Sequence, residues 1–148
     1  MIYNGEDNIM YKGGKLWLKN KGDYNMYFGQ YKPFYITVIA NDDSGSDKIF
    51  DTVEFRSDSW NGNKLLQNTY DTLKVWNEYQ EGINTLRFAH GSPTTLKRKF
   101  RIWRALIPRD KTNKRDRIRN PWLYIKLSKE KANTDKTVLH DLLVNYYD

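Results

Sequence analysis

The chain has 148 residues, a formal net charge of +7 and no Cys. The lack of Cys excludes disulfides, Cys-ligated zinc, iron–sulfur clusters and a thiol nucleophile, and two His leave little material for a His-rich metal site. No apolar run approaches the roughly 20 residues that span a bilayer, and the N-terminus lacks the basic and apolar regions of a signal peptide. The length and the 15% aromatic content predict one compact domain over residues 1–148.

The positive charge is concentrated in residues 97–119, which we call the basic segment. Eleven Lys or Arg oppose Asp110 and Asp116 there, a net charge of +9, whereas the rest of the chain has 14 basic and 16 acidic residues, a net of −2. Most of these cations are Arg, which pairs bidentately with carboxylate or phosphate and stacks on aromatic rings. The cations are Lys97, Arg98, Lys99, Arg101, Arg104, Arg109, Lys111, Lys114, Arg115, Arg117 and Arg119.

Short runs of β-branched and aromatic residues between turn-forming residues predict strands, and no long window has helical spacing. The strand at 34–40 is almost continuously apolar, which predicts burial on both faces. In the next strand we expect Ile49, Val53 and Phe55 to face the core. The elements expected in the first half are strands at 9–11 and 16–18 around a Gly13-Gly14 hairpin turn, an aromatic-rich piece at 24–31, strands at 34–40 and 49–55 around a turn at 41–47, and a loop at 57–63.

The second half continues the same pattern. Its expected strands span 73–79, 85–88, 99–107, 122–127 and 137–147, with a turn at Glu81-Gly82 and polar loops at 108–120 and 128–136. A short helix over 138–144 is the competing interpretation of the last strand. The side chains expected to face the core are Leu73, Val75 and Tyr79, then Phe100, Ile102 and Leu106, then Leu123, Ile125 and Leu127, and finally Val138, Leu142, Val144 and Tyr146.

These roughly eight strands, without a tandem repeat, predict two packed antiparallel sheets. The expected fold class is therefore all-β, an antiparallel β-sandwich with jelly-roll-like connectivity. In the strand at 99–107 we expect Arg101 and Trp103 on the face opposite to the core-facing side chains.

No motif points to catalysis, and we expect no enzyme, no catalytic residue, no metal and no cofactor. The loop 41–47 holds three Asp that could bind Ca²⁺, but it lacks the spacing and the terminal Glu of an EF-hand, so a solvated turn is favoured. His140 and Asp141 are adjacent, yet strand alternation places them on opposite faces, and His90 lies in an expected loop. No nucleophile elbow, Walker loop or Gly-x-Gly-x-x-Gly motif occurs.

The basic segment is the strongest functional signal in the sequence. It could dock on an acidic protein surface with Arg and aromatic anchors, bind nucleic acid through phosphate contacts and stacking, or be a solvated loop. We favour the protein interface, because Arg101 and Arg104 lie among aromatic residues, whereas Lys111 and Lys114 do not. The interface candidates are Arg98, Arg101, Trp103, Arg104, Arg109, Arg117, Arg119 and Trp122.

Aromatic platforms also bind sugars. Trp17, Trp60 and Trp76 could form such a platform, but aromatic side chains mostly build cores, so this interpretation is a minority one.

Several segments together resemble the C-terminal part of the tail muzzle (or stabilisation) proteins of crAss-like bacteriophages, short-tailed viruses of gut Bacteroidales. The resemblance runs from about Tyr35 to Asp148, and residues 1–34 carry none of it. The segments that carry it are KRKFRIWR at 97–104, IPRD at 107–110, RIRNPW at 117–122 and YIKL at 124–127, with KIFD at 48–51, LHD at 139–141 and VNYY at 144–147.

The resemblance implies a structural role. Proteins of this family resemble the nozzle proteins of short-tailed phages and assemble as a ring at the distal end of the tail. The expected partners are other tail proteins and further copies of the chain, and the expected location is the virion, after synthesis in the bacterial cytoplasm. The family proteins are much longer, so the chain would be one C-terminal piece. The alternative is a receptor- or glycan-binding module at a phage tail tip, and nucleic acid is a possible but not favoured partner.

Overall fold

A computed structural model describes residues 2–3, 8–18, 22–88, 95–131 and 135–147. These residues form fifteen strands and no helix, and every strand pair is antiparallel. The all-β antiparallel prediction is confirmed, although the strands are more numerous than the sequence pattern indicated. The jelly-roll connectivity and the single-domain boundary stay predictions.

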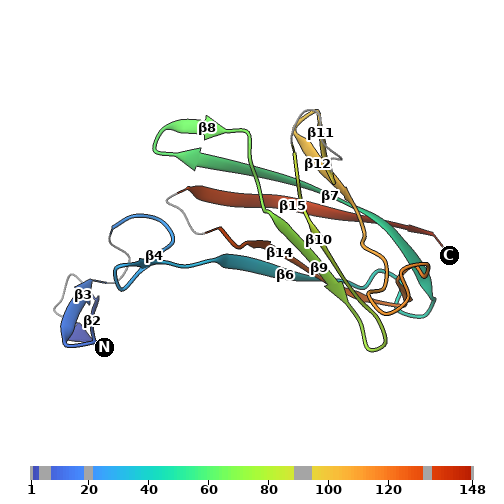
Figure 1. The fold of residues 1–148 in the computed structure, drawn as a ribbon, viewed down its shortest axis with the longest axis horizontal. Coiled ribbons are helices and arrows are strands. Elements are labelled where there is room, and N and C mark those ends of the chain that lie inside the picture. The colour runs from blue at the N-terminus through green and yellow to red at the C-terminus, as the bar shows by residue number, and fades with distance from the viewer. Residues whose placement is uncertain (1, 4–7, 19–21, 89–94, 132–134, 148) are drawn as a thin grey trace.

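Two sheets face each other across one hydrophobic core, as Figure 1 shows. The four-stranded sheet has the order β10-β9-β14-β6, where β10 is Glu81–Thr85, β9 is Thr72–Trp76, β14 is Leu123–Lys129 and β6 is Phe34–Ala40. The six-stranded sheet is built on the long strand β7, Lys48–Asn61, and its other members are β11 (Leu96–Lys99), β12 (Ile102–Leu106), β13 (Arg119–Asn120), β15 (Lys136–Tyr147) and β8 (Lys64–Leu66).

The core is formed by inward side chains of both sheets. Leu73 and Val75 of β9 and Leu123, Ile125 and Leu127 of β14 are almost wholly buried, as their alternation predicted. The six-stranded sheet contributes Val53, Phe55 and Trp103, which have no more than 1% of their surface exposed. Apolar burial of this kind stabilises by about 25 cal/mol per Å², so the two inner faces hold the sandwich together.

The first residues form an arm that extends away from the sandwich at the start of β6 (Figure 1). The Gly13-Gly14 hairpin turn is confirmed, since both glycines have positive φ and join two paired strands. The Asn25 side chain donates a hydrogen bond of 2.8 Å to the Asp135 carbonyl, which ties the arm to the loop before β15. The arm strands are β1 (Ile2–Tyr3), β2 (Asn8–Lys12), β3 (Lys15–Leu18), β4 (Met26–Tyr27) and β5 (Gln30–Tyr31).

The strand at 34–40 has the predicted bounds, but its predicted burial on both faces is wrong. β6 is the last strand of its sheet and pairs only with β14. Tyr35 and Ile39 are therefore mainly exposed, while Val38 packs against the core. A continuous apolar run does not distinguish a central strand from an edge strand.

The predicted loop at 57–63 is wrong, because β7 continues to Asn61 and turns directly into β8. Ser57 and Ser59 occupy buried positions of this strand. Their hydroxyl groups find partners on other segments, Ser57 with Thr69 and Ser59 with Thr137 at 3.0 Å. Polar residues that satisfy each other inside a sheet resemble a loop in sequence.

The turn after β9 lies at residues 77–80, before the predicted Glu81-Gly82 turn, and β10 begins at Glu81. The Asn77 side-chain oxygen accepts the backbone N–H groups of Tyr79 and Gln80, both at 2.8 Å. Tyr79 lies in this turn with 80% of its surface exposed, so its predicted place in the core is wrong. An Asn that binds the backbone two and three residues on is a local turn signal.

Two bulges in the β7–β15 pair change which side chains face the core. The last segment is a strand, and the helical alternative is wrong. The register shifts at His140, so Leu139 packs against the core where Val138 was expected. A second shift leaves Asp51 of β7 without a register partner in β15, and Phe50 is buried where Ile49 was expected. An extra residue in one strand reverses the alternation beyond it.

Candidate protein interface

The sequence 96–106 forms a hairpin, not the single strand predicted over 99–107. Lys99 pairs with Ile102, and Phe100 and Arg101 form the two-residue turn between them. Both turn residues have positive φ, 52° and 63°. A two-residue hairpin turn of this hand normally uses Asn-Gly or Asp-Gly, because other side chains are strained there. A Phe-Arg turn was therefore not predictable from turn chemistry.

The turn also fixes which face of β12 is buried, and it is opposite to the prediction. Trp103 and Ala105 face the core, with 0% and 2% of their surface exposed. Phe100, Ile102 and Leu106, all expected in the core, are exposed, and Phe100 has 85% of its surface in solvent. The wide Trp ring buries more apolar surface than Ile or Leu, which explains why its face turned inward.

Trp103 is a core residue, so its place among the interface candidates is corrected. Its indole N–H donates to the Ser57 carbonyl at 3.4 Å, and Phe88 packs edge-on against its ring at 5.1 Å between centroids. The Arg98 guanidinium lies 4.7 Å from the centroid of the same ring. Trp103 therefore supports the hairpin from beneath and is not available to a partner.

The outer side of the hairpin gathers the cations of the first part of the basic segment. Arg104 approaches Glu54 of β7 at 3.7 Å, and the Lys99 ammonium lies 5.4 Å from the Phe100 ring centroid. Among the residues that the structure describes, Lys97 and Arg101 form no ion pair. We call residues 96–106 the basic hairpin. Its exposed charge is carried by Lys97, Lys99, Arg101 and Arg104, whereas Arg98 is half-buried against Trp103 on the core-facing side.

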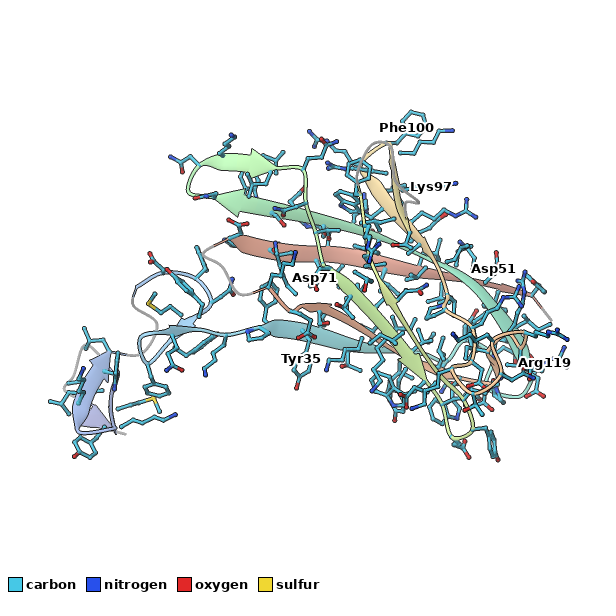
Figure 2. The ribbon with its side chains drawn as sticks, viewed as in Figure 1. Tyr35, Asp51, Asp71, Lys97, Phe100 and Arg119 are labelled. Atoms are coloured by element: carbon cyan, nitrogen blue, oxygen red, sulfur yellow. The ribbon has the colours of Figure 1, made fainter. Side chains whose placement is uncertain are left out.

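The second part of the basic segment, residues 107–120, is a packed loop at a different place on the molecule. Figure 2 shows Arg119 well away from Lys97 and Phe100. Ile118 anchors this loop with 0% of its surface exposed. The predicted single charged stretch is thus divided between two regions of the surface.

Three cations of this loop, including the interface candidates Arg109 and Arg117, have partners within the chain. Arg117 pairs with Asp51 at 2.9 Å, and Arg109 donates to the Arg115 carbonyl at 2.6 Å. Lys111 bonds to Glu81 at 3.0 Å, and this hydrogen bond lowers the pKa of the Glu81 carboxyl. These contacts hold the loop in place and leave the basic hairpin as the less neutralised cluster.

The three Trp residues considered as a sugar platform lie on elements that Figure 1 shows apart, namely β3, the end of β7 and β9. Trp76 instead stacks on Tyr124 with 5.3 Å between ring centroids, and Trp122 packs edge-on against Tyr124 at 4.9 Å. Trp122 is half-buried in this row. The row follows from the cross-strand pairing of Trp76 with Tyr124, which sequence alone does not give.

The polar groups considered for catalysis or metal binding are engaged in separate pairs. His140 contacts Asp58 at 2.8 Å. The Arg56 Nε–H is shared between the two carboxylate oxygens of Asp141, at 3.0 and 2.9 Å, and Arg56 Nη2 also donates to Asp141 Oδ2. The bonds from Arg56 lower the pKa of Asp141. His90 lies outside the described residues.

The described residues contain neither a candidate metal site nor a membrane-spanning helix. They contain no cluster of three or more His, Asp or Glu that could hold a metal ion. In the same part of the chain, no helix has the length and apolarity to cross a membrane.

Comparison with known proteins identifies the family. The sequence model of the Crassvirus muzzle protein C-terminal domain matches residues 22–110, so the similarity begins before Tyr35, where we expected it to begin. The chain is 56% identical over 138 residues to the muzzle protein of Bacteroides phage crAss001, which covers 93% of the chain and 10% of that relative. The chain thus spans about a tenth of the length of this relative. It belongs to the Crassvirus muzzle protein C-terminal domain family.

Proposed function

We propose that this chain is a structural component of a phage virion, located in the tail muzzle, and that it works by protein–protein contacts without catalysis. The name of its 56%-identical relative and the match to the muzzle domain family support this proposal. After synthesis in the bacterial cytoplasm, the chain joins other tail proteins and further copies of itself in a ring. A ring requires contacts between two different surfaces of each subunit, because a self-complementary surface closes a dimer.

The basic hairpin is the observation that carries the interface assignment. Its turn presents the exposed Phe100 ring beside Arg101 and the Lys99 ammonium, and the strand that supports them is anchored by the buried Trp103. Aromatic and Arg side chains provide most of the binding energy at protein interfaces. The rigid support beneath the hairpin lowers the entropy that docking would cost.

A charge reversal at the hairpin tests this proposal. In the Arg101→Glu, Arg104→Glu double variant, we expect incorporation into assembled tails to fall by about tenfold or more, as loss of two interface anchors predicts. Both side chains are exposed, and the one ion pair lost is the solvent-exposed contact of Arg104 with Glu54, so the melting temperature should fall only slightly. The measurement is the amount of the protein in purified particles, with thermal unfolding of the same variant.

A matched control changes the same charge at another place. Lys114→Glu with Arg115→Glu reverses two exposed cations of the packed loop, and this variant should assemble normally. If both double variants assemble equally well, the basic hairpin is not an interface. If both fail equally, net charge and not a local contact controls assembly.

A further inference from the structure

Phe100 combines unusual exposure with unusual backbone geometry. Its side chain has 85% of its surface in solvent, and its φ of 52° is one that bulky residues rarely adopt. The only aromatic or cation–π contact of its ring within the described chain is with Lys99. Strained, exposed residues persist where the surrounding structure or a partner uses them. This argues that the ring is presented to a partner.

An apolar groove on the same molecule has the properties of a binding site for such a ring. It has a volume of about 640 Å³ and lies between β6 and β15. Ile39 of β6 and Leu142, Leu143 and Val144 of β15 line it. Both strands are sheet edges, since β6 pairs only with β14 and β15 only with β7. The core of the sandwich is therefore open to solvent along this seam.

The charges of the groove complement those of the hairpin. Asp42 and Asp141 are among its lining residues, and Asp43 follows in the same loop as Asp42. The one Lys in the lining, Lys48, is buried and donates to the carbonyls of Asp43 and Pro121, at 2.5 and 2.8 Å. Its ammonium is thus engaged by the protein backbone. Of the two lining carboxylates, Asp141 is already paired with Arg56. Asp42 accepts a hydrogen bond from the neutral Tyr146 hydroxyl at 2.9 Å, so its charge can face a ligand that carries cations around an apolar tip.

The hairpin and the groove lie at opposite edges of the six-stranded sheet. Residues 52–55 of β7 pair with β12 on one side and with β15 on the other, which gives the order β11-β12-β7-β15. A contact between the two edges cannot form within one copy. Between copies it is head-to-tail, the type of contact that closes a ring.

We propose that the Phe100 side chain of one copy inserts into the groove between β6 and β15 of the next copy, with Arg101 and Lys99 facing Asp42. This inference deepens the proposed muzzle function and rests on it. The partner of the basic hairpin is then a second copy of the chain. The inserted Phe100 ring would cover the apolar side chains of the edge strands β6 and β15, which the isolated chain leaves exposed.

Cysteine cross-linking tests the contact directly, because the 148 residues contain no Cys. A disulfide forms only when the two Cα atoms come within about 7 Å. The double variant Phe100→Cys, Leu143→Cys should give covalent multimers of the protein after mild oxidation of assembled particles. Each single variant should stay monomeric on a denaturing gel. The control pair Phe100→Cys, Tyr79→Cys places the second thiol in the exposed 77–80 turn and should not cross-link.

Each other outcome overturns the inference in a recognisable way. Absence of multimers in particles that contain the double variant excludes the contact between Phe100 and the groove but does not contradict the proposed muzzle function. Dimers of the single Phe100→Cys variant mean that two hairpins contact each other. A covalent product with a different tail protein means that the Phe100 ring binds to that protein. Absence of the unmodified protein from particles contradicts the proposed function itself.

A second variant separates the role of the ring from that of the fold. Asn tolerates the left-handed conformation, so Phe100→Asn should keep the hairpin and leave the melting temperature equal or higher. We expect it to lose incorporation into particles. Normal incorporation of this variant would show that the exposed ring is not an anchor.

Discussion

Replacement of Trp103 by Ala is expected to lower the free energy of unfolding by about 3–5 kcal/mol, the usual cost of removing a large buried aromatic ring. Trp103 has no exposed surface, and its ring contacts the Phe88 ring, the Arg98 guanidinium and the Ser57 carbonyl. The cavity cannot close easily, because the residue opposite to Trp103 in β7 is Phe55, which is itself buried. Denaturant titration followed by circular dichroism measures the loss.

Trp122→Ala is the matched control. It removes the same type of ring from a half-buried residue that lies immediately before β14. Its effect on stability should be clearly smaller. A Trp103→Ala protein with unchanged stability and impaired assembly would instead show that Trp103 is an interface residue, as the sequence analysis predicted.

The elements that the sequence predicted correctly are those whose local pattern and tertiary environment agree. β14 has alternating Leu123, Ile125 and Leu127 in a central position, and all three are buried as expected. The Gly13-Gly14 turn is local, since glycine adopts positive φ without strain. In these cases the sequence pattern and the observed structure follow from the same physical preference.

The errors arise where distant segments decide the outcome. The serines of β7 are buried because hydroxyl partners on Thr69 and Thr137 reach them, which no local pattern reveals. The bulge at His140 depends on the register with β7. For β6, the number of neighbouring strands decides its exposure, and that number is a property of the whole sheet.

The candidate site shows the same division. Charge density along the chain located the basic segment and drew attention to Arg101 and Arg104, which lie exposed on the basic hairpin. It could not show that the segment turns back at Phe100 and Arg101, because this turn lacks the glycine or asparagine that normally marks one. Nor could it show that Arg117 and Lys111 are paired with Asp51 and Glu81, which lie at least 30 residues away in the chain.

The packed loop of the basic segment depends on the absence of a side chain at Gly82 of β10. A Cβ atom there would lie 2.6 Å from the Arg109 carbonyl oxygen and 3.1 Å from that of Pro108. Both contacts are with backbone, which cannot rotate away as a flexible side chain would. The loop is fixed against β10 beside this point, since the Lys111 N–H donates to the Glu81 carbonyl at 2.7 Å.

Gly82→Ala is therefore expected to lower the free energy of unfolding by about 1–3 kcal/mol, the cost typical of overpacking. Gly45→Ala is the control, because a Cβ atom at Gly45 meets only an Asp43 carboxylate oxygen, at 3.8 Å. Chemical denaturation of the two variants side by side measures the difference, and equal stabilities would mean that the loop moves aside without a loss of stability.

Because the basic hairpin lies elsewhere on the surface, Gly82→Ala should lower stability while the folded fraction still assembles (Figure 2). Loss of stability without loss of assembly would separate the structural part of the basic segment from the part proposed to bind.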